Sequence, residues 1–224
     1  ARRLVERDIK VIANAGGVNP LACARAVGQA APGLKVAVVR GDDVLDRIDG
    51  WMAAGYEMRD LDSGLPLASI RDRILSANAY LGALPLAEAL ATGARVVIAG
   101  RTTDTALAVA PMIHRFGWRE DDWDRLASGT VAGHLIECGA QVTGGNCQVD
   151  WNSLPDLDEI GYPIVEVEPD GSFTLTKHPG TGGRVNADVV KEQLLYEIHD
   201  PSRYLTADCT ADFTTIRLND AGPD

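Results

Sequence analysis

The sequence of 224 residues has no long hydrophobic run, few aromatic residues and a deficit of positive charge. No apolar stretch approaches the roughly 18 residues of a membrane-spanning helix, and the first residues lack the apolar segment of a secretory signal peptide. We therefore expect a soluble, cytoplasmic protein with no membrane partner. Lys and Arg number 21 against 32 Asp and Glu, for a net charge of −11. Because no basic stripe could displace phosphate counterions, nucleic acid is excluded as a partner, which leaves a small-molecule substrate and, as the other candidate partner, a second copy of the chain.

Cysteine is scarce, and its four positions form no CxxC pair: Cys23, Cys138, Cys147 and Cys209. A chain of this length buries a core without disulfides, so we expect reduced thiols. The sequence also lacks the GxGxxG fingerprint of dinucleotide sites and the GxxxxGK[ST] loop of nucleoside triphosphatases. No cofactor is predicted from these patterns.

Strands and helices alternate along the first part of the sequence. Short apolar runs at Ile9–Ala13, Leu34–Val39 and Arg95–Ala99 are typical of strands that are buried on both faces. Between the first two runs, Asn19 and Pro20 form a helix start, and Gly33 follows the helix end. A further helix is expected to start near Thr103–Asp104. The pattern predicts an α/β fold: a mainly parallel, Rossmann-like sheet with helices on both faces, without a dinucleotide fingerprint.

The pattern changes after about Trp151. Polar and apolar residues alternate on both sides of Asp170-Gly171, which predicts a β-hairpin. The stretch "NADVVKEQLLYEIHDP" predicts a helix that ends at Asp200-Pro201, and "CTADFTTIRL" predicts another strand. Residues 1–150 are thus predicted to form an α/β core, and residues 151–224 a hairpin, helix and strand elaboration of the same domain. The chain starts in a charged helical segment and stops after a predicted strand, so we expect the sheet to lack an edge strand.

Two polar loops follow predicted parallel strands, at Asn14–Pro20 and Gly100–Thr105. Ligands bind beyond the carboxyl ends of such strands, where helix N-termini also point. Glycine lets backbone approach a ligand, and arginine can clamp a carboxylate or phosphate. The alternative is a pair of ordinary turns with helix caps. The predicted substrate-binding residues come from these loops and from a later glycine pair: Asn14, Gly16, Gly17, Arg101, Asp104, Gly144, Gly145 and Asn146.

The stretch "GTVAGHLIECGAQVTGGN", from Gly129 to Asn146, carries the strongest catalytic signal. In a helix, His134, Glu137 and Cys138 occupy positions i, i+3 and i+4 and share one face. A histidine and a carboxylate on one face can act as general acid and base, so His134 and Glu137 are the predicted catalytic residues. They could also form half of a zinc site, but no second cluster supplies further ligands, and no metal is predicted. Alternatively, the small residues mark a tightly packed helix with a hydrogen-bonded interior histidine.

The segment Lys177–Asn186, "KHPGTGGRVN", is rich in glycine and in positive charge. It precedes a predicted helix whose N-terminus begins near Asn186, so exposed N–H groups would face it. We predict an anion-binding loop, although a flexible connection with Asn186 as helix cap would give the same sequence. The predicted anion-binding residues are Lys177, Gly180, Thr181, Gly182, Gly183 and Arg184.

Several long blocks resemble the acyclic terpene utilisation family of AtuA type. They cover nearly the whole chain in order: "NAGGVNP", "SANAYLGALPLAEALATGARVVIAGRTTDTALA", "DDWDRLASGTVAGHLIECGAQVTGGN", "GYPIVEVEPDGSFTLTKHPGTGG" and "VKEQLLYEIHDPSRYLTADCTADF". The resemblance implies a bacterial protein in the breakdown of citronellol- and geraniol-like terpenes, which proceeds through CoA thioesters. Family members usually begin with a further "GAGFSGDR"-like segment and extend beyond the end of this chain.

This resemblance and the candidate residues lead to one main hypothesis and two alternatives. The main hypothesis is an enzyme, or part of one, that acts on an acyl-CoA or branched carboxylic acid derivative by hydration, lyase or hydrolysis chemistry. The CoA moiety of the substrate is then the expected occupant of an anion-binding loop. The alternatives are a non-catalytic binding or assembly subunit of the same pathway and a folded fragment without activity.

Overall fold

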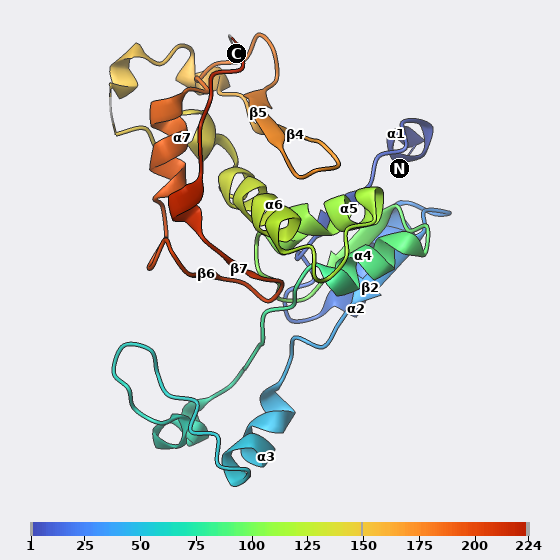
Figure 1. Cartoon of the computed structure of the whole chain (residues 1–224). Helices are drawn as coiled ribbons and strands as arrows, with labels where there is room; N and C mark the ends of the chain where they lie inside the picture. The colour runs from blue at the N-terminus through green and yellow to red at the C-terminus, as the bar shows by residue number, and fades with distance from the viewer. Residues whose placement is uncertain (1, 149, 223–224) are drawn as a thin grey trace. The chain divides into compact units, whose positions relative to one another are not determined.

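A computed structural model describes residues 2–148 and 150–222 of the chain (Figure 1). The chain divides into two compact units. Unit 1 comprises Ala1–Leu81 and Gly93–Thr102, and unit 2 comprises Gly82–Thr92 and Thr103–Asp224. The division at residue 150 into a core and an elaboration of one domain stays a prediction. Among the described residues, no helix is both long and apolar enough to cross a membrane.

Unit 1 contains a three-stranded parallel sheet. Its strands are β1 (Val11–Ala13), β2 (Val36–Val39) and β3 (Val96–Ala99), in the order β1-β3-β2. Val96 of β3 pairs with Val11 on one side and with Val36 on the other. Together with the helices and the antiparallel hairpin of unit 2, this sheet confirms the predicted α/β class.

The outer strands of this sheet are less buried than the sequence predicted. All four residues of β3 are buried, but Val11 in β1 is 38% exposed, and only Val39 is buried in β2. The prediction of burial on both faces is therefore wrong for β1 and β2. The reason is strand order, since β3 lies in the centre and the other two strands are edges. A short apolar run gives no information about its place in a sheet.

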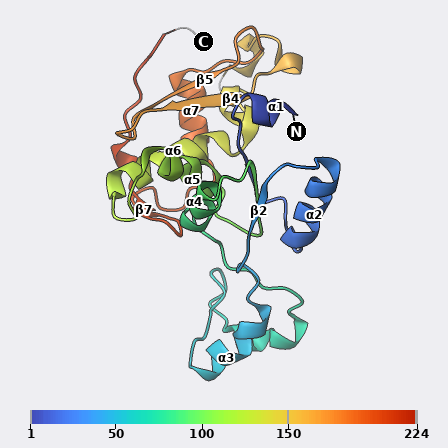
Figure 2. The same ribbon diagram turned by 90° about the vertical axis from the view of Figure 1, so that its right-hand side faces the viewer.

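Helix α2 (Pro20–Ala30) starts and ends as predicted. The Asn19 side chain accepts a hydrogen bond from the N–H of Ala22 at 3.0 Å, Pro20 occupies the first helical position, and Gly33 follows with φ +83°. The helix packs against β2 and β3, and Figure 2 shows it beside β2. A short charged helix, α1 (Arg2–Glu6), precedes β1.

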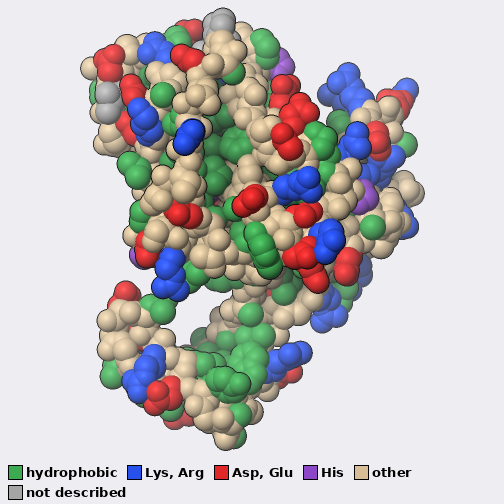
Figure 3. Space-filling view, in the orientation of Figure 1, with side chains coloured by type: hydrophobic (Ala, Val, Ile, Leu, Met, Phe, Trp, Pro, Cys, Tyr) green, Lys and Arg blue, Asp and Glu red, His purple; other side chains and the backbone are tan. Residues whose placement is uncertain are grey.

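The part of unit 1 that follows β2, residues 40–81, contains only short helices and has little core of its own. These helices are η1 (Leu45–Arg47), α3 (Ile48–Ala53), η2 (Leu67–Ser69) and η3 (Arg71–Arg73). Leu61 is fully exposed and Leu75 is 90% exposed, and Figure 3 shows hydrophobic side chains at the surface of this segment. Because little apolar area is buried here, we expect this segment to open locally before the sheet does.

Unit 2 is mainly helical, with two small antiparallel pairs of strands. Its α-helices are α4 (Leu84–Ala91), α5 (Ala106–Phe116), α6 (Trp123–Ile136) and α7 (Ala187–Leu194), and its strands are β4 (Pro163–Val167), β5 (Phe173–Lys177), β6 (Tyr204–Leu205) and β7 (Thr210–Ala211). Short 3₁₀ helices connect them: η4 (Gly139–Thr143), η5 (Trp151–Ser153), η6 (Leu157–Glu159) and η7 (Phe213–Thr215). Strands β4 and β5 pair from Pro163↔Lys177 to Val167↔Phe173, which confirms the hairpin at Asp170-Gly171.

Three predicted boundaries in this unit are wrong. Helix α7 ends at Leu194, well before Asp200, since Glu197 adopts a left-handed conformation with φ +52°. The last predicted strand shortens to β7, because the Asp212 side chain accepts hydrogen bonds from the N–H and hydroxyl of Thr214 and so forms a turn. Helix α5 begins at Ala106, a little later than predicted.

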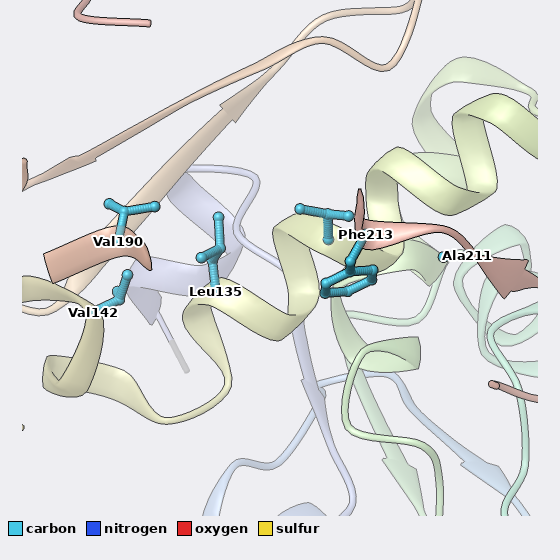
Figure 4. Packing of buried hydrophobic residues seen from close by; sticks show 6 residues of the cluster. Leu135, Val142, Val190, Ala211 and Phe213 are labelled. Carbon is cyan, nitrogen blue, oxygen red and sulfur yellow. The ribbon is translucent and has the colours of Figure 1, made fainter. Parts of the chain in front are cut away.

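The core of unit 2 fixes the position of α6. Six buried residues from α6, η4, α7, β7 and η7 form one cluster (Figure 4): Val131, Leu135, Val142, Val190, Ala211 and Phe213. Segments far apart in the sequence therefore meet along one face of α6. His134 precedes Leu135 on this helix, and its buried ring contacts Phe213 of the same cluster.

Candidate functional site

His134 is completely buried in unit 2. Its Nε2 lies 2.9 Å from the backbone oxygen of Gln193 in α7. Because a carbonyl oxygen can only accept, Nε2 carries a proton and donates it in this bond. The imidazole ring packs edge-on against the rings of Tyr204 and Phe213, with 5.4 Å between centroids in each pair. These contacts fix the ring's orientation and its tautomer.

The other ring nitrogen of His134 has two polar neighbours. Nδ1 lies 3.4 Å from Oε1 of Glu137 and 3.4 Å from the hydroxyl of Tyr204. In a neutral imidazole Nδ1 can accept a hydrogen bond from the phenol, and after protonation it can donate to the carboxylate. The Glu137 side chain is 13% exposed, against 1% for His134. Nδ1 is therefore the position at which a proton can be gained or lost.

Burial and negative charge favour the protonated forms of two groups near His134, the Tyr204 phenol and the Cys138 thiol. Burial, followed by the charge of Glu137, raises the pKa of Tyr204 to about 12, so its phenol remains a hydrogen-bond donor at neutral pH. Burial also raises the pKa of the Cys138 thiol, against the opposing effect of the Gln193 amide. A thiol that resists ionisation is a poor nucleophile. The raised pKa therefore disfavours Cys138 as a nucleophile.

Gln193 holds His134 from two directions, and sequence reasoning missed it. While its backbone oxygen accepts from Nε2 of the imidazole, its side-chain Nε2 donates to the backbone oxygen of His134 at 3.1 Å. The side chain is almost fully buried, and its Oε1 has no hydrogen-bond partner in the part of the chain that the structure describes. A glutamine in an amphipathic helix gives no sequence signal of burial, so only the packing of α7 on α6 identifies it.

In unit 1, the predicted ligand loop Asn14–Pro20 contacts Ala99, the last residue of β3, which directly precedes the second predicted loop. The N–H of Gly16 donates to the oxygen of Ala99 at 3.1 Å, and a Cβ on Gly16 would overlap that oxygen. Gly16 is thus required for the approach of one backbone to another. The backbone oxygen of Asn14 accepts from the N–H of Gly17, which has φ +48°. These contacts give the glycines a structural role, and their contact with a substrate stays a prediction.

Asp42 organises the Gly100–Arg101 loop, and no sequence pattern pointed to it. Its buried carboxylate accepts from the N–H of Arg101 at 2.8 Å and from the side-chain amide of Asn78 at 2.9 Å. A Cβ on Gly100 would overlap the Asp42 carboxylate, which explains the glycine. The side chain of Arg101 is exposed.

Of the predicted substrate-binding residues in unit 2, Asp104 is exposed and Gly144 is packed. Asp104 does not cap α5, whose N-cap residue Thr105 makes no side-chain cap bond. Its charge nevertheless contributes to the raised pKa of both Tyr204 and Cys138. Asp104 thus belongs with the acidic surroundings of His134.

A Cβ on Gly144, which has φ +114°, would lie 2.8 Å from Leu154 Cδ1, so close packing accounts for this glycine.

The predicted anion loop, Lys177–Asn186, turns most of its donors inward. The N–H groups of Gly182 and Gly183 donate to backbone oxygens of the segment 155–159, and Lys177 Nζ donates to the oxygen of Thr181 at 3.0 Å. The Arg184 guanidinium donates to the oxygen of Ser153 at 2.9 Å. A Cβ on Gly182 would overlap the oxygen of Asp156, so close backbone packing accounts for this glycine. Gly180, at φ +76°, faces open space.

The helix after this loop begins as predicted, since the Asn186 side chain accepts from the N–H of Val189. An anion at the loop would have to compete with the internal acceptors that its donors already contact. Anion binding by this loop stays a prediction.

Comparison with known families supports the resemblance. Residues 1–224 match the family described as "Acyclic terpene utilisation family protein AtuA". The chain belongs to this family. No curated protein and no solved structure matches the chain. Membership of the AtuA family connects the chain with acyclic terpene utilisation and gives no reaction.

This AtuA family member also has a pocket next to Gln193, the residue that contacts His134. A pocket of about 290 Å³ lies beside the C-terminal end of α7, with Gln193 in its wall. Asn146, a predicted substrate-binding residue, also lines it. Gly145, whose Cβ would lie 2.9 Å from the oxygen of Ala140, shapes the turn that leads to Asn146. Across residues 2–148 and 150–222, no group of three or more His, Cys, Asp or Glu side chains is placed to hold a metal ion.

Proposed function

We propose that the protein is an enzyme of acyclic terpene catabolism that transfers a proton on a branched carboxylic acid derivative, as the free acid or its CoA thioester. His134 is the acid and base, and Glu137 is its charged partner. The observation that carries this proposal is the position of His134 Nδ1, 3.4 Å from both the Glu137 carboxylate and the Tyr204 phenol. Family membership supports the pathway in this proposal, and this geometry supports its proton-transfer chemistry.

The division of labour within the trio follows from its hydrogen bonds. Nε2 of His134 is committed to the Gln193 oxygen, so Nδ1 is the exchangeable position. The Glu137 carboxylate stabilises the imidazolium that forms when Nδ1 takes up a proton, and the Tyr204 phenol donates to Nδ1 when the ring is neutral. Because Glu137 is the more exposed of the pair, we propose that protons reach the buried imidazole through its carboxylate.

Hydration and lyase reactions of such substrates move a proton to or from a carbon atom, which is the step tested below, and hydrolysis would use the same pair to take a proton from the attacking water. The proposed contacts for the carboxylate or phosphate groups of the substrate lie in each unit separately. In unit 1 the contact is the Arg101 guanidinium, since the N–H groups of Gly16 and Gly17 already donate to the oxygens of Ala99 and Asn14. In unit 2 the contacts are the donors of the Lys177–Arg184 loop. These assignments rest on residue type and on the loops' polar character.

Deuterium exchange tests the proposal without knowledge of the full reaction. The full chain is incubated in D₂O with branched acyl-CoA esters and the free acids, and deuterium at the carbon next to the carbonyl is measured by mass spectrometry. We expect exchange with the wild type and a loss of about 10²–10⁴-fold in His134→Gln. Glu137→Gln, which keeps the size of the side chain and removes its charge, should also lose most of the exchange.

The matched control is Glu166→Gln, which makes the same change at an exposed position on β4. It should exchange at the wild-type rate. Exchange at the wild-type rate in His134→Gln would refute the catalytic assignment.

A second function, that of a non-catalytic binding or assembly subunit, is favoured by the complete burial of the His134 ring. A ring that packs between Tyr204 and Phe213 and bonds to Gln193 also fits a purely structural histidine. In that case the wild type catalyses no exchange with any tested acid or thioester, and His134→Gln lowers the melting temperature only.

A further inference from the structure

The last part of unit 1 before α4, residues 45–81, forms an arm with almost no core of its own. Ile48 is the only buried residue of this arm. Figures 1 and 2 both show α3, which belongs to the arm, projecting away from β2. A unit of fewer than about 40 residues usually needs a disulfide, a metal ion or an oligomeric partner to be stable. The arm contains no cysteine, and the described residues contain no metal-binding group, which leaves the oligomeric partner.

The large apolar side chains of the arm lie at its surface. Six of them are at least 39% exposed: Tyr56, Leu61, Leu65, Ile70, Leu75 and Tyr80. A fully exposed Leu or Ile offers about 60–120 Å² and a Tyr about 150–250 Å², so these residues together expose on the order of 500 Å². One side of a standard protein interface buries about 800 Å², of which somewhat more than half is apolar. The arm therefore exposes enough apolar surface for one side of a stable dimer.

Hydrogen bonds hold the most exposed of these leucines in a fixed loop. The Arg59 guanidinium donates to the Glu57 carboxylate at 2.8 and 2.9 Å and to the backbone oxygen of Gly64 at 2.7 Å. The N–H of Gly64 donates to the oxygen of Asp60 at 2.9 Å. Leu61, which is fully exposed, lies within the turn that these bonds close. A side chain presented on a preorganised loop loses less entropy on association than one on a flexible loop.

The charges of the arm favour a second copy over a strongly charged partner. Arg59 pairs with Glu57, and Arg71 pairs with Asp49 at 2.6 Å, so both arginines contact carboxylates of their own arm. Four Arg stand against six Asp and Glu in residues 45–81, for a net charge of only −2. Such an arm gives little electrostatic attraction to a basic or acidic surface. Two-fold pairing makes an apolar surface complementary to itself, and a second copy supplies that surface.

We propose that residues 45–81 form a dimerisation arm, whose exposed leucines and tyrosines pack against the same arm of a second copy of the chain. The inference goes beyond the proposed proton transfer and does not depend on it, because neither His134 nor Glu137 belongs to the arm.

Sedimentation velocity of the 224-residue chain tests the proposal. We expect an equilibrium between a species of 23.8 kDa and one of twice this mass, with a dissociation constant in the micromolar range or lower. Because apolar burial drives the association and both chains are acidic, the affinity at about 1 M salt should equal or exceed that at about 0.1 M. A chain that stays monomeric well above micromolar concentration, or a dimer that dissociates at high salt, overturns the proposal.

Two variants test the contacts of the arm. Leu61→Ser and Leu75→Ser each remove a leucine that is at least 90% exposed from both arms of the dimer, and each should raise the dissociation constant at least about tenfold. The matched control is Leu205→Ser, at a leucine of unit 2 that is 66% exposed, and it should dimerise as the wild type does. Circular dichroism should show wild-type folding in all three variants, since none of these side chains is buried in the single chain. Wild-type affinity in both arm variants refutes the arm as the interface.

Discussion

Replacement of Gly133 by alanine should destabilise unit 2, because α6 has no room for a methyl group at this position. A Cβ on Gly133 would lie 2.8 Å from Cα and 3.0 Å from the oxygen of Thr105, which precedes α5. Ordinary contacts between carbon atoms are about 3.5–4.0 Å. Both atoms of Thr105 are backbone, so they cannot rotate away as a side chain would. The two helices must separate by roughly 0.7 Å or more to reach ordinary contact.

The expected loss of stability follows from two opposing effects. Overpacking of a core by one methyl group costs about 1–3 kcal/mol. Alanine in place of glycine inside a helix returns about 0.5–1 kcal/mol. The net cost lies between about 0 and 2.5 kcal/mol, and its middle value of about 1.25 kcal/mol corresponds to a fall in melting temperature of about 3–5 °C for a chain of this size.

Thermal unfolding followed by circular dichroism measures the fall, and two alanine variants serve as controls. Gly129→Ala lies on the same helix and places its Cβ against side-chain atoms only, 3.1 Å from Met112 Sδ and 3.2 Å from Trp118 Cζ3, so its cost should be smaller. Gly28→Ala in α2 meets no atom within 4 Å and should be neutral or stabilising. A melting temperature of Gly133→Ala at or above that of Gly129→Ala would show that the two helices are not packed as described.

Two further predictions concern pH. Burial raises the pKa of Asp208 above its ordinary value of 3.8 while its Oδ1 accepts from the N–H of Ala83 at 2.7 Å, so its contribution to stability falls as pH rises above about 4. Asp208→Asn should therefore gain stability relative to wild type between pH 4 and pH 7 in urea denaturation, and an unchanged difference would contradict the burial of this charge. The pKa of Tyr204 is about 12 in the folded chain, against an ordinary value of 10.0, so the unfolded chain loses this proton first as pH rises. Wild type should lose more stability than Tyr204→Phe between pH 9 and pH 11, and parallel losses would refute the raised pKa.

Local signals predicted local structure well. Asn19 and Pro20 fixed the start of α2, and Asp170-Gly171 fixed the hairpin, because each signal acts through its own neighbours in the sequence. The errors arose where tertiary structure or a side chain intervened. The turn at Asp212 replaced a predicted strand, and the left-handed Glu197 ended α7 early. Aspartate does not interrupt strands, and glutamate does not end helices, regularly enough for either boundary to be predicted from the sequence.

Only those residues of the candidate site that lie close together in the sequence could be predicted to share a site. His134 and Glu137 lie one helical turn apart, so their shared face could be read from spacing alone. Tyr204 and Gln193, which complete the environment of the imidazole, lie 70 and 59 residues away in the sequence. Contacts over such separations leave no trace in a single sequence.

Glycine misled the sequence reasoning for a physical reason. A glycine allows backbone to approach a ligand or another backbone equally well. At Gly16 and Gly182 the structure has backbone oxygens at the place where a side chain would be, so the absent Cβ is explained by packing. Backbone packing therefore already explains these two glycines, and they give no separate evidence for a ligand site. Evidence for a site has to come from groups that packing does not explain.

The polar trio in the core of unit 2 is such a group. Packing alone needs an apolar side chain at position 134, because Leu135, Phe213 and their neighbours already form a hydrophobic cluster. Replacing buried ionisable pairs with apolar residues of similar volume is often neutral or stabilising. The bond from Nε2 to the Gln193 oxygen explains one nitrogen of the ring, and packing gives no reason for the second, which faces a carboxylate and a phenol. An apolar variant, His134→Leu, that is as stable as wild type and inactive in deuterium exchange would separate the chemical role of this residue from its structural one.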